Sequence, residues 1–250
     1  MIGLLSLLLR TAAAVVVILA AVGWDKLRRR DPMQGLARRA QRYWCRALLR
    51  GCGVGVEVRG VPLQPGPLLV VANHVSWLDI LVLASQWRLG FLSKRDVEQW
   101  PGVGQVATAL GTLYIDRGSN HGANGARAAM AARLAAGGRV VFFPEATTGH
   151  GESLLPFRPR LFQAAIDTTA SVQPVAIRYL DATDSLSGAA PLVGDVRMID
   201  HVKRLLAHRP IRAVVVVTPA IAVGQVDGRT AMARACAAQI DEALNGIGGC

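Results

Sequence analysis

The stretch that decides the fold is 68-LLVVANHVSWLDILVLAS-85, in which an apolar run is followed by a polar loop and then by a second apolar run. The first run, Leu68 to Ala72, is short and apolar throughout, which is typical of a strand buried on both faces. The second, from Trp77 to Ser85, fits a short helix. A strand followed at once by a helix is the unit from which largely parallel sheets are built.

This unit recurs along residues 53–250. Strands are predicted at residues 54–58, 68–72, 90–93, 112–115, 139–143, 172–179 and 211–218. Helices are predicted at residues 77–85, 97–110, 122–136, 198–207 and 229–245. The fold class is therefore α/β, with a largely parallel, mixed sheet covered by helices. Ligands of such sheets bind beyond the carboxyl ends of the strands, so residues that follow a strand are the candidates for chemistry.

Composition narrows the classes of partner. Hydrophobic residues make up 52% of the 250 residues and charged residues only 18%, which excludes a disordered chain. The net charge of +11 attracts polyanions: nucleic acid, anionic lipid or an acidic carrier. With 5% aromatic residues and no zinc-finger spacing, nucleic acid is disfavoured. The four cysteines form neither a CxxC pair nor a cluster with histidine, so we expect free thiols and no metal.

Residues 1–30 have the character of a membrane anchor. The segment from Ile2 to Trp24 is nearly all apolar, and the basic residues Lys26, Arg28, Arg29 and Arg30 follow it directly. A cleaved secretory signal carries its positive charge ahead of the apolar run. We therefore expect an uncleaved anchor that spans the inner membrane and leaves the rest of the chain facing the cytoplasm. Arg10 is costly inside a bilayer, so a shallow interfacial helix is the alternative.

Residues 31–52 predict a basic amphipathic helix, opened by Asp31 as a cap with Pro32 behind it and closed by Gly51. Arginines recur every four residues on one arc, at positions 38, 42, 46 and 50. Apolar residues occupy the opposite arc, at positions 33, 36, 40, 43 and 47. The helix suits the surface of an anionic leaflet, and a charged face packed on the domain is the alternative.

The first candidate for chemistry is the loop after the strand at residues 68–72. His74 lies on it, and Asp79 follows five residues later at the start of the next helix. If the loop folds back, the carboxylate can hold one imidazole nitrogen and leave the other to take a proton from a hydroxyl. The pair has no nucleophile of its own, which favours direct transfer to a substrate hydroxyl. Ser76 is a less suitable nucleophile, because no GxSxG turn surrounds it.

Two later segments also follow strands. Arg117 comes just after the strand at residues 112–115 and offers a planar fork of donors suited to phosphate, unless it pairs with an acid such as Asp116. The segment 143-FPEATTG-149, with Arg158 beyond it, places a glutamate and two hydroxyls where they can bind a polyol and an arginine where it can bind phosphate.

Together these segments resemble the glycerolipid acyltransferase family, the lysophosphatidic acid acyltransferases and their relatives. The family's NHxxxxD block matches Asn73, His74 and Asp79. Its second block, an aspartate or similar residue before arginine, matches Asp116 and Arg117, and its fourth, an apolar strand holding a proline, matches Pro174. Its FPEGT block matches residues 143–147 except that Ala146 stands in place of glycine. The four blocks occur in the family's order over residues 68–179.

The resemblance implies that residues 53–250 form an acyltransferase domain with His74 as general base and Asp79 as its orienting partner. It implies an acceptor site that includes Asn73, Arg117 for the phosphate, Glu145, Ala146, Thr147 and Arg158. The implied reaction moves a fatty acyl group from acyl-CoA or acyl carrier protein to lysophosphatidic acid, without a cofactor or metal. Relatives acting on lyso-ornithine lipid have closely similar motifs. A lipid hydrolase and a non-catalytic lipid-binding protein are the alternatives from other classes.

Overall fold

The structure, a computed structural model, describes residues 2–30, 35–116 and 120–247. Within these ranges seven strands form one sheet in the order β1-β7-β6-β2-β5-β3-β4. The strands are β1 (Val54–Gly60), β2 (Leu68–Ala72), β3 (Gly90–Lys94), β4 (Leu113–Ile115), β5 (Arg139–Phe142), β6 (Ser171–Leu180) and β7 (Ile211–Val217). All neighbours pair in parallel except β6 and β7, which pair antiparallel. The predicted mixed, largely parallel sheet is confirmed.

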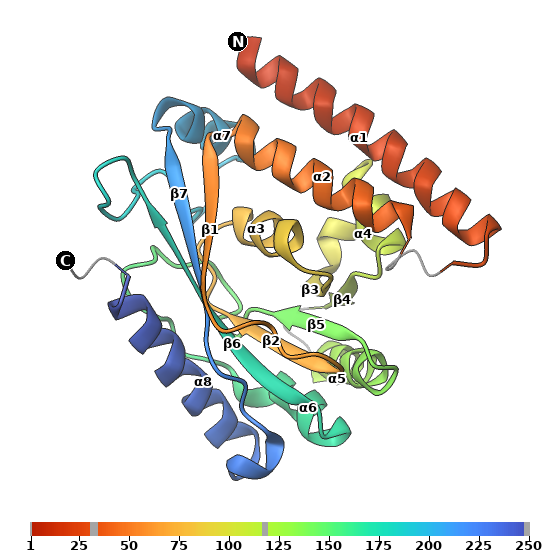
Figure 1. The fold of residues 1–250 in the computed structure, drawn as a ribbon, viewed down its shortest axis with the longest axis vertical. Helices are drawn as coiled ribbons and strands as arrows, with labels where there is room; N and C mark the ends of the chain where they lie inside the picture. The colour runs from red at the N-terminus through yellow and green to blue at the C-terminus, as the bar shows by residue number, and fades with distance from the viewer. Residues whose placement is uncertain (1, 31–34, 117–119, 248–250) are drawn as a thin grey trace.

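Helices cover both faces of the sheet (Figure 1). One face carries α2 (Leu36–Gly51), α3 (Leu78–Gln86) and α7 (Met198–Ala207), and the other carries α5 (Asn120–Ala135), α6 (Gln163–Thr168) and α8 (Gly228–Asn245). Successive residues of β2 alternate between the two cores, with Leu68 and Val70 in the first and Leu69 and Val71 in the second. Burial on both faces explains why this strand is apolar throughout.

The predicted strands are all present, whereas two helical regions differ from the prediction. The helix predicted at residues 97–110 is divided into the short η1 (Arg95–Gln99) and α4 (Val103–Ala109). Pro101 and Gly102 lie between them, and Gly102 has a φ of +74° that a helix cannot contain. The helix α6, only six residues long, was not predicted, because so short an element has too few turns to show a helical period.

The two N-terminal helices, α1 (Ile2–Leu27) and α2, form an antiparallel pair (Figure 1). The buried carboxylate of Asp25 near the end of α1 accepts hydrogen bonds from the backbone N–H groups of Leu36 (3.0 Å) and Ala37 (2.8 Å). A Cβ atom at Gly35 would collide with this carboxylate. Asp25 therefore caps α2, which begins at Leu36, and the predicted cap and first turn at residues 31–34 lie outside the described residues.

The membrane anchor predicted at residues 1–30 corresponds largely to α1. Among the described residues, no helix combines the length and apolar character needed to cross a bilayer. Ile18 and Val22 of α1 instead bury their side chains in a small core with Val106 and Leu110 of the α4 region. Over this stretch the helix therefore packs as part of the fold.

The arginine row of α2 lies against the end of α3. Arg38 is buried and donates to the carbonyl oxygen of Trp87 (2.9 Å), while Arg42 (2.9 Å) and Arg46 (3.2 Å) both donate to that of Ser85. Carbonyl groups in the last turn of a helix lack partners within the helix and carry its negative partial charge. These arginines therefore satisfy the carboxyl-terminal end of α3, the helix whose first turn holds Asp79.

Candidate active site

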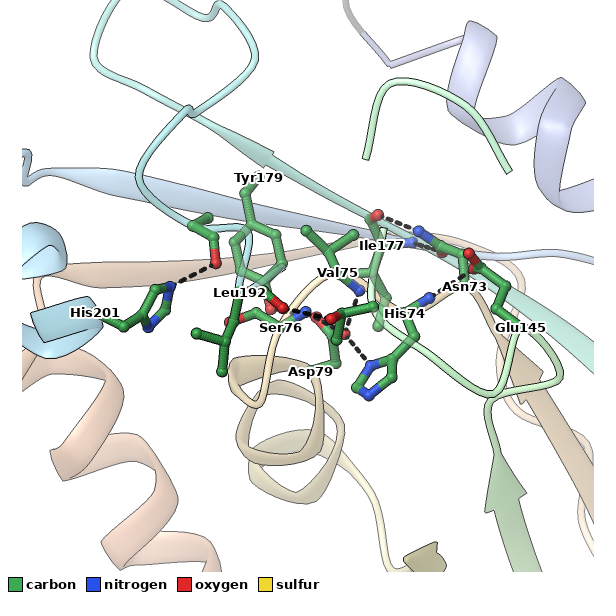
Figure 2. A network of polar contacts seen from close by, with 12 residues as sticks. Asn73, His74, Val75, Ser76, Asp79, Glu145, Ile177, Tyr179, Leu192 and His201 are labelled. Atoms are coloured by element: carbon green, nitrogen blue, oxygen red, sulfur yellow. Dashed lines mark hydrogen bonds and ion pairs between the residues drawn. The ribbon is translucent and has the colours of Figure 1, made fainter. Parts of the chain in front are cut away.

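Two of the loops singled out in the sequence, those after β2 and β5, meet beside β6 at the carboxyl edge of the central strands. β2 lies between β5 and β6, so the segment after β2 is flanked by the segment after β5 and by the middle of β6. This arrangement places His74, Asp79, Glu145 and Asn73 in one polar network (Figure 2). The site lies where ligands bind in sheets of this type.

The contact predicted between His74 and Asp79 is present. Nδ1 of His74 lies 2.7 Å from Oδ2 of Asp79, and the same oxygen accepts the backbone N–H groups of Val75 (2.8 Å) and Ser76 (2.9 Å). Since the carboxylate only accepts, Nδ1 carries the proton and Nε2 is left as the basic nitrogen. The Asp79 side chain is 0% exposed and that of His74 15%, so the imidazole alone of this dyad reaches the surface.

The loop after β5 holds His74 from a second side. The imidazole stacks on the ring of Phe143, with centroids 4.1 Å apart and planes inclined by 15°. The backbone N–H of His74 donates to Oε1 of Glu145 (2.8 Å), and its carbonyl oxygen accepts the N–H of Gly149 (2.8 Å). The ring and both backbone polar groups of His74 are therefore all engaged, which fixes the direction in which Nε2 points.

Glu145 is buried, and both of its carboxylate oxygens accept backbone N–H groups. Oε1 accepts that of His74, and Oε2 accepts that of Leu155 (3.2 Å). Burial raises the pKa of Glu145, and the two N–H donors oppose this rise in part. In the described structure this carboxylate joins the loop after β2 to the loop after β5.

Asn73 is likewise buried and bonded to backbone. Its Nδ2 donates to the carbonyl oxygen of Ile177 (2.8 Å), and its Oδ1 accepts the N–H of the same residue (2.7 Å). The amide thus continues the hydrogen bonding between β2 and β6 by one residue beyond the strand end. An amide side chain suits this place because it carries a donor and an acceptor side by side.

The remaining sequence-predicted residues lie farther along the loops. Thr147 is exposed, as is Arg158, whose backbone N–H donates to the carbonyl oxygen of Pro144 (3.0 Å). Arg117 lies outside the described residues. Ala146 has a φ of +60°, in the left-handed region that favours glycine. The glycine of the related FPEGT block is therefore explained by backbone conformation, and alanine carries strain here.

Replacing Ala146 by glycine should stabilise the protein by roughly 1 kcal/mol, because the cost of ~1–2 kcal/mol for a left-handed residue with a Cβ atom exceeds the added freedom of unfolded glycine. Denaturant unfolding of Ala146→Gly measures this change. Thr169→Gly is the matched control, since Thr169 is also left-handed (φ +53°) but caps α6. A loss of stability in Ala146→Gly would contradict the strain.

Sequence reasoning missed two supports of the dyad. Tyr179 of β6 donates its hydroxyl to Oδ1 of Asp79 (2.6 Å). Leu192 donates its N–H to the carbonyl oxygen of Val75 (3.0 Å) and accepts the hydroxyl of Thr148, so a loop far along the chain joins two motifs. The sequence did contain a signal for Tyr179, because a tyrosine in a buried apolar strand must find a partner for its hydroxyl.

Ser76, the alternative nucleophile, has a fully buried side chain, and its Oγ has no hydrogen-bond partner among the described residues. Its backbone serves Asp79 instead, through its N–H group. Two surface grooves, of about 410 Å³ and 580 Å³, lie elsewhere: the first is lined by residues of α5, η2 (Pro159–Phe162) and α8, the second by residues of β7 and α8. Neither is lined by His74 or Asp79, so the chemistry of the dyad is assigned from its geometry and not from these grooves.

Comparisons with known proteins identify the family of this chain. The family model described as Acyltransferase matches residues 55–178, which include both loops of the network. A lyso-ornithine lipid O-acyltransferase of Pseudomonas aeruginosa is 40% identical over 81% of this chain and 80% of its own length. A 1-acyl-sn-glycerol-3-phosphate acyltransferase of Neisseria meningitidis is 38% identical over 66% of this chain and 65% of its own length.

The fold is also found among solved structures. The 1-acyl-sn-glycerophosphate acyltransferase of Thermotoga maritima superposes with a TM-score of 0.67 over 97% of this chain and 96% of its own, at 17% identity. The α/β sheet carries a histidine–aspartate pair at its carboxyl edge, within the stretch that the acyltransferase family model matches. The chain belongs to the acyltransferase family, and it is an enzyme of lipid metabolism.

Proposed function

We propose that this enzyme transfers a fatty acyl group from a thioester, acyl-CoA or acyl carrier protein, to the free hydroxyl of 1-acyl-sn-glycerol 3-phosphate, giving phosphatidic acid. The observation that carries the proposal is the dyad, in which a buried carboxylate orients a partly exposed imidazole. The relative from Neisseria meningitidis, whose name specifies this acceptor, supports it.

In the proposed reaction, Nε2 of His74 removes the proton of the acceptor hydroxyl as the oxygen attacks the thioester carbonyl. Asp79 stabilises the imidazolium that forms. The tetrahedral intermediate then expels the thiolate, which takes the proton from the imidazolium, so that an ester and a free thiol leave the enzyme. The acceptor is the nucleophile, and the reaction requires neither a covalent acyl-enzyme nor a cofactor or metal.

For the acceptor site we propose Arg117 and Arg158 as ligands of the phosphate and Thr147 as a hydroxyl facing the glycerol backbone. Thr147 and Arg158 are exposed beside the dyad loops, which supports their part in the proposal. The contacts of Asn73 and Glu145 favour a supporting role for these two residues, since their polar atoms bond to the backbone of the site. Ala146 would act on the acceptor by shaping the loop that carries Thr147.

We also propose that the enzyme works at a membrane surface, and at its cytoplasmic face because the expected thioester donors are cytoplasmic. The outer face of α1 is apolar and exposed at Val16, Val17, Trp24 and Leu27, and basic residues follow at positions 26 and 28–30. An apolar face beside a basic cluster suits an anionic leaflet, into which a helix can sink without spanning it.

Charges placed on that face should weaken membrane binding. The double variant Val16→Asp and Val17→Asp puts two carboxylates where apolar side chains meet the lipid, so its co-sedimentation with vesicles of phosphatidylglycerol and phosphatidylcholine should fall at least tenfold, since an aspartate in the apolar region costs on the order of 2.5–3.5 kcal/mol. Val196→Asp, at an exposed position outside α1, is the matched control. Equal sedimentation of all three proteins would contradict the proposed surface.

A second acceptor is favoured by a specific observation. The 40% identity to the lyso-ornithine lipid O-acyltransferase of Pseudomonas aeruginosa extends over four fifths of both chains. A lyso-ornithine lipid also presents a free hydroxyl to the base, so the same dyad serves either substrate. The headgroups differ in charge, and the residues that contact the headgroup must decide between them.

In the test, purified enzyme receives radiolabelled palmitoyl-CoA as donor. Lysophosphatidic acid is the acceptor in one reaction and lyso-ornithine lipid in a parallel one. Product from lysophosphatidic acid supports the main proposal and Arg117 as a phosphate ligand. Product from lyso-ornithine lipid alone moves the enzyme to the second acceptor. Fatty acid release without an acceptor indicates a hydrolase, and lysolipid binding without turnover indicates a non-catalytic protein; either result would overturn both acceptors.

A further inference from the structure

We infer that Tyr179 is a positioning residue of the acyl transfer reaction, which fixes the carboxylate of Asp79 and moderates its pull on the imidazole of His74. The inference rests on the proposed function, because it requires His74 to act as a base. It concerns a residue near the end of β6, the strand that holds Pro174, 100 positions beyond Asp79 in the chain.

The carboxylate of Asp79 has two unequal oxygens. Oδ2 accepts three hydrogen bonds, from Nδ1 of His74 and from the N–H groups of Val75 and Ser76. Oδ1 accepts the hydroxyl of Tyr179 at 2.6 Å (Figure 2). Asp79 has no exposed surface, so water cannot replace a lost partner at Oδ1 without entering the core. Tyr179 thus supplies the hydrogen bond to Oδ1 that the loop after β2 does not provide.

The buried position of Tyr179 suits it to hold the carboxylate of Asp79 in place. It lies on β6, beside β2, and its side chain packs in the core on the face covered by α2, α3 and α7. Burial and the neighbouring carboxylate raise the pKa of Tyr179 well above its usual value. The phenol is therefore neutral and donates its only proton to Asp79.

A neutral donor on Oδ1 draws negative charge toward itself and away from Oδ2. Without it, the carboxylate would attract a proton on His74 more strongly, and the base would stay protonated to higher pH. Glu145 is the other titratable side chain that contacts the dyad residues, through the backbone of His74. His201 bonds to Trp77 and to Ala190 and lies beyond them. In the described structure neither Glu145 nor His201 is hydrogen-bonded to Tyr179, so their hydrogen bonds do not depend on the hydroxyl that Tyr179→Phe removes.

The test is the pH dependence of kcat in Tyr179→Phe, which removes one oxygen and keeps the ring. The acidic limb of the profile should move to higher pH, and the plateau should fall by roughly tenfold with unchanged KM for both substrates, as when an outer partner of a catalytic group is lost. Tyr43→Phe, which alters an exposed tyrosine of α2, is the matched control and should behave as the wild type.

A structural role alone would lower the plateau, or the fraction folded, and leave the limb in place; that result overturns the inference. If Tyr179→Phe fails to fold, 3-fluorotyrosine can replace tyrosine in a chain carrying Tyr43→Phe and Tyr114→Phe. Its more acidic phenol is a stronger donor, so the limb should move to lower pH, and an unmoved limb again contradicts the inference. An active His74→Ala variant would instead refute the proposed base itself.

Discussion

His74→Ala is expected to lower kcat by about 10²–10⁴ at saturating donor and acceptor, the contribution of a positioned general base. The imidazole is the one exposed part of the dyad, and its Nε2 is left unengaged by the contacts that fix Nδ1 and the backbone. KM for both substrates should change little, because the lost interaction is made in the transition state.

The matched control for this variant is His208→Ala, which removes an exposed imidazole at the end of α7. Radiolabelled acyl transfer measures both variants, and thermal melting shows that each is folded. Turnover of His74→Ala within a few-fold of the wild type would remove His74 from the chemistry and with it the mechanism proposed above.

Asp79→Asn should have the second large effect, a loss of about 10²–10⁴ in kcat together with a loss of about 1–3 kcal/mol in the free energy of unfolding. The carboxylate accepts four hydrogen bonds, whereas an amide has one acceptor oxygen and an NH2 group. If the NH2 group faces His74, the imidazole must accept at Nδ1 and carry its proton on Nε2, where it cannot act as a base. If the NH2 group faces Tyr179, the phenol loses its acceptor.

Two measurements are needed for this variant, kcat from the transfer assay and stability from denaturant unfolding. Asp200→Asn, in an exposed pair with Arg197, is the control and should change either quantity by little. A lower free energy of unfolding with unchanged kcat would show that Asp79 serves the fold alone. A lower kcat with an unchanged free energy of unfolding would show that the amide finds four partners in a rearranged loop.

The sequence was most informative where the site is local. His74 and Asp79 lie five residues apart, directly after a strand that is apolar throughout, so both the strand and the folded-back loop could be predicted from a single short stretch. The seven strands could be predicted for the same reason, because each is an apolar run bounded by loops. The catalytic roles and the acceptor contacts stay predictions until they are measured.

What could not be predicted depends on residues distant in the chain. Tyr179 meets Asp79 only because β6 pairs with β2, a pairing that no local pattern specifies. Asp25 caps α2 from a different helix, a contact that no local sequence pattern specifies. The membrane anchor was predicted from an apolar run and its basic flank, and neither shows that the core of the fold buries Ile18. Whether the glycine at position 146 of the motif served backbone conformation or close approach could be decided only from a φ angle.

The arginines of α2 that bond to the end of α3 have a further consequence. A helix of nine residues is about 14 Å long, so the carbonyl group of Ser85, to which Arg42 and Arg46 both donate, lies at the other end of a short helix from Asp79. A shortened chain that starts at β1 would retain every motif residue but lose the arginines of α2 that bond to the end of α3.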